Sequence, residues 1–122
     1  MSYNLLNPVV IFQNADMSMS LTSDSVEVKL QDNIGVQLHW TGSPTGAFGV
    51  QISMDHKKDT EGNVVVPGHW ISLPLTPPII AAGAPDDAYI DLTQMSAVYI
   101  RVTYAATGGV GSLNGFVNAK GV

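Results

Sequence analysis

The chain has 122 residues, a size that suits one domain, and no long linker divides it, so we expect a single domain over residues 1–122. The sequence contains no cysteine, which excludes disulfides, thiolate metal sites and a cysteine nucleophile. The net charge is −5 and only five residues are Lys or Arg, so we expect no nucleic-acid partner.

The low content of charged residues is the unusual feature of the composition. Asp, Glu, Lys and Arg together make up 12% of the chain, against roughly 25% in an ordinary domain. The hydrophobic fraction is 45%, so neutral polar and apolar groups must cover most of the surface. Two interpretations stay open: much of the surface faces other subunits, or the domain has an ordinary neutral surface rich in Ser and Thr.

The N-terminal residues 1–14 are too apolar for a free tail, and we expect either an arm that docks on a neighbour or the first strand. They lack the basic region and the small-residue cleavage site of a signal peptide. No apolar run reaches the roughly 18–20 residues that span a bilayer. We therefore expect a soluble protein that is made in the cytoplasm and has no membrane partner.

Apolar and polar residues alternate with a period of two along much of the chain, which is typical of half-buried antiparallel strands. In residues 34–41, for example, the apolar side chains of Ile34, Val36, Leu38 and Trp40 fall on one face. The alternation predicts strands in residues 26–30, 34–41, 47–55, 88–92 and 97–105.

Turn-forming residues separate these strands. The Gly and Pro of residues 41–46 predict a hairpin loop, and residues 60–63 predict a second turn. The three prolines of residues 74–78 predict an extended edge or a loop crossing, because proline cannot donate a hydrogen bond within a sheet. Residues 91–98 allow at most one short helical turn, which Thr and Ser would cap.

The last part of the chain predicts a terminal hairpin. Residues 106–112, ATGGVGS, supply a glycine-rich turn, after which residues 112–119 pair back on residues 98–104. Gly115 predicts a bulge or a close approach of another backbone. Together these patterns predict an all-β protein, an antiparallel β-sandwich of jelly-roll type with little or no helix.

No group of residues predicts catalysis, so we expect no enzyme, no catalytic residue and no cofactor. His39, His56 and His69 lie far apart, and the chain lacks a nucleophile elbow, a phosphate-binding glycine loop and closely spaced metal ligands. His39 is expected on a solvent or interface face, His56 in a charged loop and His69 before a strand. The carboxylates of residues 55–61 and 86–87 could form an irregular calcium site, but solvated loops are the favoured interpretation, so we expect no metal.

Two residues are candidates for binding. Arg101 is the only arginine and lies in the most regular strand, where a structural ion pair with Glu27 or Asp91 is the favoured role, and a partner subunit the alternative. Trp70 follows a loop and is the best candidate for an exposed aromatic side chain. An exposed aromatic ring also suggests a carbohydrate-binding or host-adhesion module as an alternative function.

Several short sequence features follow one another in an order that resembles small virion proteins of tailed bacteriophages and prophages. These features are WTG at residues 40–42, the strand at residues 46–53, the lone Trp70, and RVTY at residues 101–104 followed by GSL at residues 111–113. Each feature is common alone, and their order over most of the chain carries the resemblance.

The resemblance implies a β-sandwich with a structural role in the virion, as a capsid decoration or cement subunit or as another head or tail component. It implies protein partners, namely a major capsid or tail protein and further copies of the chain, with a trimer as one arrangement. It supplies no catalytic residue. The side chains that we expect at an interface or a ligand are Leu5, Leu6, Phe12, Trp70 and Arg101.

Overall fold

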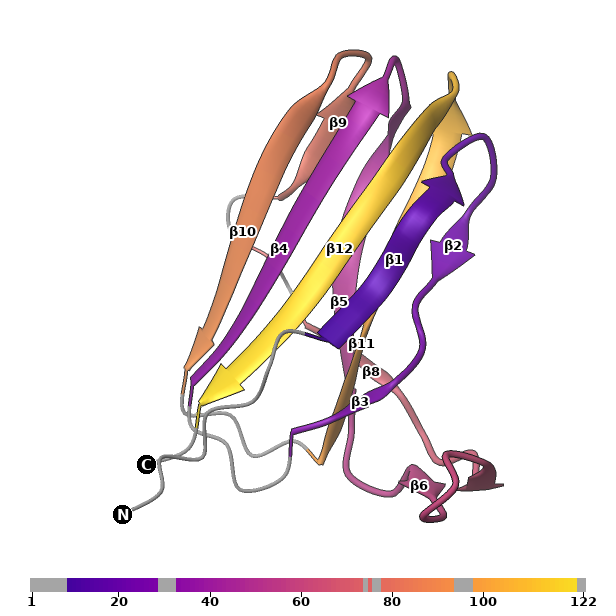
Figure 1. Ribbon diagram of the computed structural model, residues 1–122, viewed down its shortest axis with the longest axis vertical. Helices are drawn as coiled ribbons and strands as arrows, with labels where there is room; N and C mark the ends of the chain where they lie inside the picture. The colour runs from indigo at the N-terminus through magenta and orange to yellow at the C-terminus, as the bar shows by residue number, and fades with distance from the viewer. Residues whose placement is uncertain (1–8, 29–32, 74, 76–77, 94–97, 121–122) are drawn as a thin grey trace.

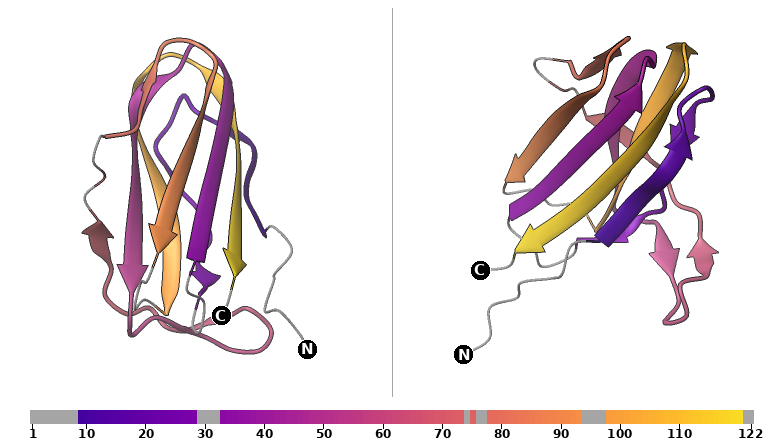
Figure 2. Two further views of the ribbon diagram at one scale, coloured as in Figure 1. Left: turned by 90° about the vertical axis from the view of Figure 1, so that its left-hand side faces the viewer. Right: turned by 45° about the horizontal axis from the view of Figure 1, so that its top comes forward.

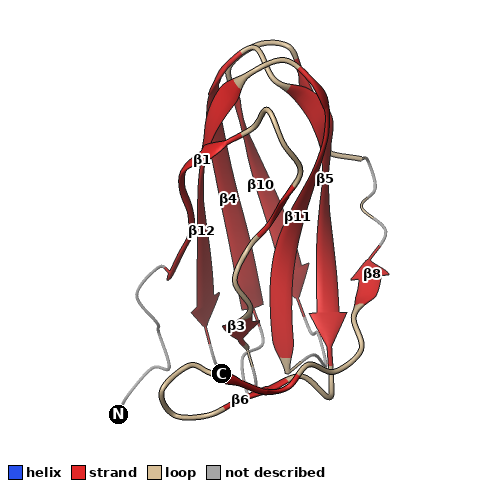
Figure 3. Ribbon diagram, turned by 90° about the vertical axis from the view of Figure 1, so that its right-hand side faces the viewer, coloured by secondary structure: helices blue, strands red, loops and turns tan. Residues whose placement is uncertain are grey.

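The computed structural model describes residues 9–28, 33–73, 75, 78–93 and 98–120. These residues form two antiparallel sheets that face each other, together with a small two-stranded sheet (Figure 1). Figure 3 shows strands and loops only, and no described residue is helical. The predicted all-β sandwich is therefore confirmed.

The first sheet has four strands, which lie side by side in Figure 1. In spatial order they are β1 (Val9–Asp16), β12 (Gly111–Lys120), β4 (Asn33–Gly42) and β10 (Asp86–Thr93). Residues 9–16 of the predicted arm or first strand are thus a strand, whereas residues 1–8 lie outside the described residues.

The second sheet has six strands around a long central pair, β11 (Tyr99–Gly108) and β5 (Thr45–Ser53). Short strands flank this pair: β2 (Leu21–Thr22) and β3 (Val26–Glu27) lie beside β11, and β8 (Ile71–Leu73) and β9 (Ile80–Ala82) lie beside β5. The two-stranded sheet consists of β6 (Lys57–Lys58) and β7 (Val64–Val66).

The core lies between the two large sheets and consists of the apolar side chains that the alternation placed on one face of each strand. The rings of Trp40, Phe48 and Tyr104 form its aromatic centre, with successive ring centroids 5.0 and 4.8 Å apart. Tilted ring pairs at these distances add to the energy of burial. The Trp40 indole N–H donates to the carbonyl of Ala84 at 3.0 Å, so its polar atom is satisfied.

Two predicted hairpins are wrong. Strand β4 does not pair with β5, because β4 lies between β12 and β10 in the first sheet while β5 belongs to the second. Likewise β12 pairs with β4 and β1 rather than with β11. Residues 41–46 and 106–112 therefore cross between the sheets. Alternation shows which side chains face the core, but a crossing and a hairpin both satisfy it, so it does not identify the partner strand.

The two crossings, at Gly42–Thr45 and Gly108–Gly111, contact each other at one end of the sandwich, where loops join the two layers (Figure 2). The Ser43 N–H donates to the carbonyl of Val110 at 2.8 Å. Gly42 and Gly109 both have positive φ, 86° and 75°. A Cβ on Gly109 would collide with the carbonyl oxygen of Ser43, so glycine is required there by contact as well as by conformation.

Other local predictions are confirmed. The turn at residues 60–63 joins β6 to β7. Gly115 faces a bulge of β1, where the register shifts on both sides of Phe12, and a Cβ on Gly115 would come within 3.1 Å of Leu38 and Phe12. Residues 91–93 belong to β10, and the rest of the predicted helical turn, residues 94–97, lies outside the described residues.

The contact between the two crossings leads to a stability prediction. Gly109→Ala should lower the free energy of unfolding by about 1 kcal/mol for the left-handed conformation and by a further ~1–3 kcal/mol for the collision with Ser43. Gly62→Ala is the matched control, because Gly62 also has positive φ (86°) but an added Cβ meets no atom within 4 Å. Urea unfolding measures both variants. Equal losses for the two would contradict a tight contact between the crossings.

Candidate interaction site

The segment between β5 and β8, residues 54–70, leaves the second sheet and folds against its outer face. We call it the excursion. It contains the β6–β7 hairpin, which projects beyond the lower end of the sandwich in Figure 1. Its inner residues His56 and Trp70 contact the outward-facing side chains of β11. A patch of aromatic and polar groups therefore covers the lower part of this face.

Alternation along β11 positions the centre of this patch. Ile100 and Val102 face the core, so Tyr99 and Arg101 face outward. Gln51 of β5 is the register partner of Arg101, and its side-chain carbonyl accepts a hydrogen bond from the Arg101 Nε–H at 2.7 Å. The guanidinium carbon lies 4.2 Å from the centroid of the Trp70 ring. This is a cation–π contact.

His56 supports the tryptophan from within the excursion. Its ring centroid is 5.0 Å from that of Trp70 and 4.9 Å from that of Tyr99. The Nδ1 atom lies 2.8 Å from the carbonyl oxygen of Pro67, which can only accept, so Nδ1 carries the proton. Nε2 then accepts from the Ser25 hydroxyl at 3.0 Å. Both ring nitrogens are satisfied, and the side chain is fixed in place.

Gln51, His56, Trp70, Tyr99 and Arg101 together form what we call the Arg101–Trp70 cluster. Two of the five predicted contact residues, Trp70 and Arg101, are thus brought together although they are far apart in sequence. Phe12 is a core side chain with 6% exposure. Leu5 and Leu6 lie outside the described residues.

The expected ion pair of Arg101 with Glu27 or Asp91 is wrong. Arg101 has a neutral partner, Gln51, because the cross-strand register places that amide beside it. Within the described part of the chain, the ion pairs join His39 to Asp87, Lys58 to Asp24 and His69 to Asp55. Burial lowers the pKa of Arg101, because it removes water from the charged form. The guanidinium is nevertheless charged at neutral pH.

Sequence analysis did not single out His56 as a member of the cluster. His56 lies in a loop between charged residues, as expected, but its side chain is buried, with 7% exposure. Its neighbours in sequence, Asp55 and Lys57, are charged, so the local sequence gives no indication that the His56 side chain is buried. Gly68 is the one local signal: it has a φ of 71°, and a Cβ there would come within 2.5 Å of the His56 backbone nitrogen.

A carboxylate ties the two ends of the excursion together. The Asp55 side chain accepts hydrogen bonds from the backbone N–H of His69 at 2.7 Å, from its ring Nδ1 at 2.7 Å and from the Ser53 hydroxyl at 3.1 Å. The hydrogen bonds from His69 lower the pKa of Asp55 well below its usual range. In return, the Asp55 carboxylate raises the pKa of His69.

The acidic residues that were considered as a calcium loop have structural partners. The Asp59 carboxylate accepts the backbone N–H groups of Glu61 and Asn63, both at 2.9 Å, and so stabilises the β6–β7 turn. These hydrogen bonds, chiefly that from Asn63, lower the pKa of Asp59. Asp87 is paired with His39, which is exposed on the outer face as expected. Among the residues that the structure describes, no three His, Asp or Glu side chains gather as a metal site.

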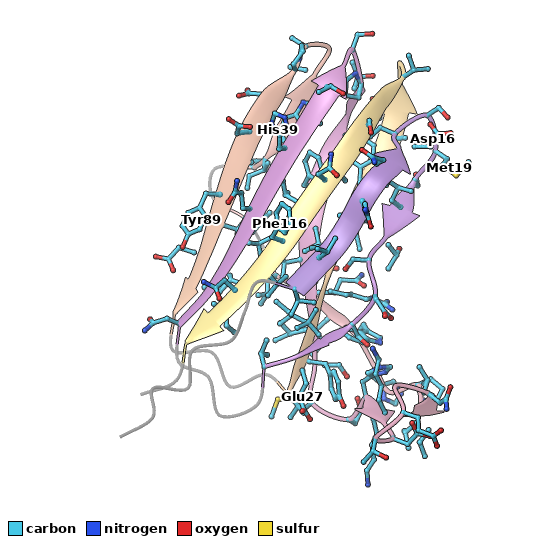
Figure 4. The ribbon with its side chains drawn as sticks, viewed as in Figure 1. Asp16, Met19, Glu27, His39, Tyr89 and Phe116 are labelled. Carbon is cyan, nitrogen blue, oxygen red and sulfur yellow. The ribbon has the colours of Figure 1, made fainter. Side chains whose placement is uncertain are left out.

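The outer face of the first sheet is open and carries another aromatic side chain (Figure 4). Tyr89 is 67% exposed and lies over Gly35 of the neighbouring strand, where an added Cβ would be 2.7 Å from the tyrosine oxygen. Gln37 joins Tyr89 to Phe116 in one cross-strand row. The more exposed aromatic ring is therefore Tyr89, because Trp70, the predicted one, is half-buried against Arg101.

The Asp55–His69 pair predicts a pH dependence of stability. The contribution of His69 is present below its ordinary pKa of 6.5 and is lost as the pH rises through the higher folded value. The contribution of Asp55 is present above its ordinary pKa of 3.8 and is lost as the pH falls through the lower folded value. Asp55→Asn should therefore destabilise the protein most at about pH 5, and the loss should be smaller at about pH 9.

Urea titrations of both proteins across this range measure the effect. Asp24→Asn is the control, since it removes an exposed carboxylate whose partner is a lysine, Lys58, and not a histidine. A loss in Asp55→Asn that does not change between the two pH values would contradict the linkage.

Comparison with known proteins supports the fold and no more. No protein-family model matches the chain, and no curated protein matches its sequence. Among solved structures, the fold is similar to a chain in a structure of infectious bursal disease virus, Gx strain, with a TM-score of 0.50 and 11% identity. That similarity covers 94% of this chain and 31% of the viral chain.

A second similar structure is dimeric latent PorU from Porphyromonas gingivalis, with a TM-score of 0.47 and 12% identity over 98% of this chain and 13% of that one.

Among the described residues, no helix has the length and apolar character needed to cross a membrane.

Proposed function

We propose that the protein is a non-enzymatic structural subunit of a virus particle and acts through protein–protein contacts. More narrowly, we propose a bacteriophage particle, in which the chain serves as a capsid decoration or cement subunit or as another head or tail accessory protein. Its partners are then the major capsid or tail protein and further copies of itself, as a trimer or another homo-oligomer, and its location is the virion.

The exposed apolar edge of β7 carries this proposal. Val64, Val65 and Val66 are 54%, 58% and 41% exposed, in a hairpin that projects from the sandwich. Free edges of β-branched residues pair readily with other chains, and monomeric proteins usually blunt them with charge, proline or a cover. The Asp55–His69 contact and the buried His56 fix the excursion that carries this edge. An apolar edge fixed in an outward position suits contact with a partner.

Two further observations support the proposal. Only 12% of the residues in the chain are charged, a composition that suits a domain whose surface is partly covered by other subunits. The order of the sequence features favours a virion protein over other β-sandwich proteins, and the similarity in fold to a chain in a virus structure agrees with it.

Light scattering on a size-exclusion column, over a range of concentrations, tests self-association. We expect a discrete oligomer, and Val65→Lys should raise its dissociation constant at least about tenfold, because it places a charge in the apolar contact. Thr60→Lys is the matched control, since Thr60 is an exposed residue at the tip of the same hairpin.

A wild-type monomer at every concentration that also fails to bind assembled particles would overturn the proposal. Equal association of Val65→Lys and the wild type would remove β7 as the contact.

Carbohydrate binding is a second candidate, and the position of Tyr89 favours it. Its ring lies close to Gly35 and the side chain is largely open to solvent, as a sugar-binding aromatic residue requires. An immobilised glycan screen tests this function. Binding that Tyr89→Ala abolishes and Trp70→Ala leaves intact would support the module and locate it on the first sheet.

A further inference from the structure

We propose that the Arg101–Trp70 cluster is a docking point for a carboxylate of a partner protein, an Asp or Glu side chain presented to the Arg101 guanidinium. This inference rests on the proposed function, since it specifies the chemistry of one contact between this protein and another virion subunit. It concerns the outer face of the second sheet, whereas the association described above concerns the edge of β7.

The first argument is that the charge of Arg101 has no counter-ion among the described residues. Arg101 is partly buried against Trp70, and its hydrogen-bond partner Gln51 is neutral. None of the ion pairs among the described residues includes Arg101. A partly desolvated guanidinium next to a neutral amide is stabilised further when an anion approaches, because the cost of removing water has already been met.

The second argument is the orientation of the guanidinium. An arginine has five N–H donors in a rigid plane. Gln51 accepts the Nε–H, and the Trp70 ring lies against the guanidinium, whose carbon is 4.2 Å from the ring centroid. No described residue accepts a hydrogen bond from the Nη groups. A carboxylate can meet both Nη groups end-on with two parallel hydrogen bonds, the arrangement that makes arginine selective for planar anions.

The third argument favours a carboxylate over a phosphate. A phosphate dianion or a nucleic-acid backbone is usually bound by several cations together. Lys58 of the excursion is already paired with Asp24 and with the Ser25 carbonyl. The net charge of −5 on the chain repels polyanions. A single carboxylate beside Arg101, in contrast, neutralises the positive charge of one guanidinium. Aromatic and arginine side chains are also the residues most enriched in the energetic centres of protein interfaces.

A titration followed by NMR tests the proposal directly. Arg101 is the only arginine, so its Nε–H signal is unambiguous in the whole chain. The probe is N-acetyl-aspartate methylamide at constant ionic strength, and N-acetyl-asparagine methylamide is the neutral control. We expect a saturable shift of the Arg101 signal with a dissociation constant of about 1–10 mM for the carboxylate, and no saturation for the amide.

Variants make the test specific. Arg101→Lys keeps the charge but loses the planar fork, and it should weaken binding at least about fivefold, as read from the indole N–H of Trp70. His39→Gln, on the opposite sheet, should bind the carboxylate as the wild type does. The wild-type titration alone decides the proposal if Arg101→Lys does not fold.

Several outcomes would overturn the inference. They are shifts that do not saturate, equal binding of acid and amide, equal binding by Arg101→Lys, or inorganic phosphate that binds more tightly than the carboxylate. Light scattering keeps this inference separate from the proposed function. If the protein forms an oligomer but its Arg101 signal does not change with added carboxylate, the proposed structural role stands and only this contact is ruled out.

Discussion

The sandwich depends on one interaction, the mutual burial of the apolar faces of the two large sheets. Each sheet has one apolar face, and these two faces leave water only by covering each other. The fully buried Trp40 of β4 and Tyr104 of β11, which both contact Phe48, link the two sheets in the middle of this contact. Because the inner faces are used up in this way, contacts with other molecules must come from the outer faces and the edges.

The core could be predicted from the sequence, whereas the connections could not. Alternation identified Ile34, Val36, Leu38 and Trp40 as buried, and each is at most 1% exposed. The Gly and Pro of residues 41–46 predicted a hairpin between the strands on either side, whereas the chain crosses between the sheets there. Periodicity is a property of one strand, and pairing is a property of two. Gly109, which allows the crossings to contact each other, could be recognised as a turn residue but not as a contact.

The candidate site shows the same division. Trp70 and Arg101 were recognised one by one, because a lone tryptophan after a loop and a lone arginine in a strand are unusual. Their contact depends on the path of the excursion, which His56 fixes by hydrogen bonds to Ser25 and Pro67. The first of these hydrogen bonds joins residues that are 31 positions apart in sequence, and the second joins residues 11 positions apart. No local sequence pattern predicts them. The partner of Arg101 was mistaken for the same reason, since Gln51 lies 50 residues away and is adjacent only through register.

The place of β12 in the first sheet bears on the order in which the chain can fold. This strand lies between β1 and β4, and among the described residues β1 pairs with no other strand. During synthesis, therefore, β1 leaves the ribosome long before its partner exists, and the first sheet stays divided until residues 111–120 have emerged. Pairing between distant segments slows folding, because a long loop must close before the contact stabilises the chain. The bulged, apolar first strand must meanwhile avoid other partners, among them the same strands of neighbouring nascent chains.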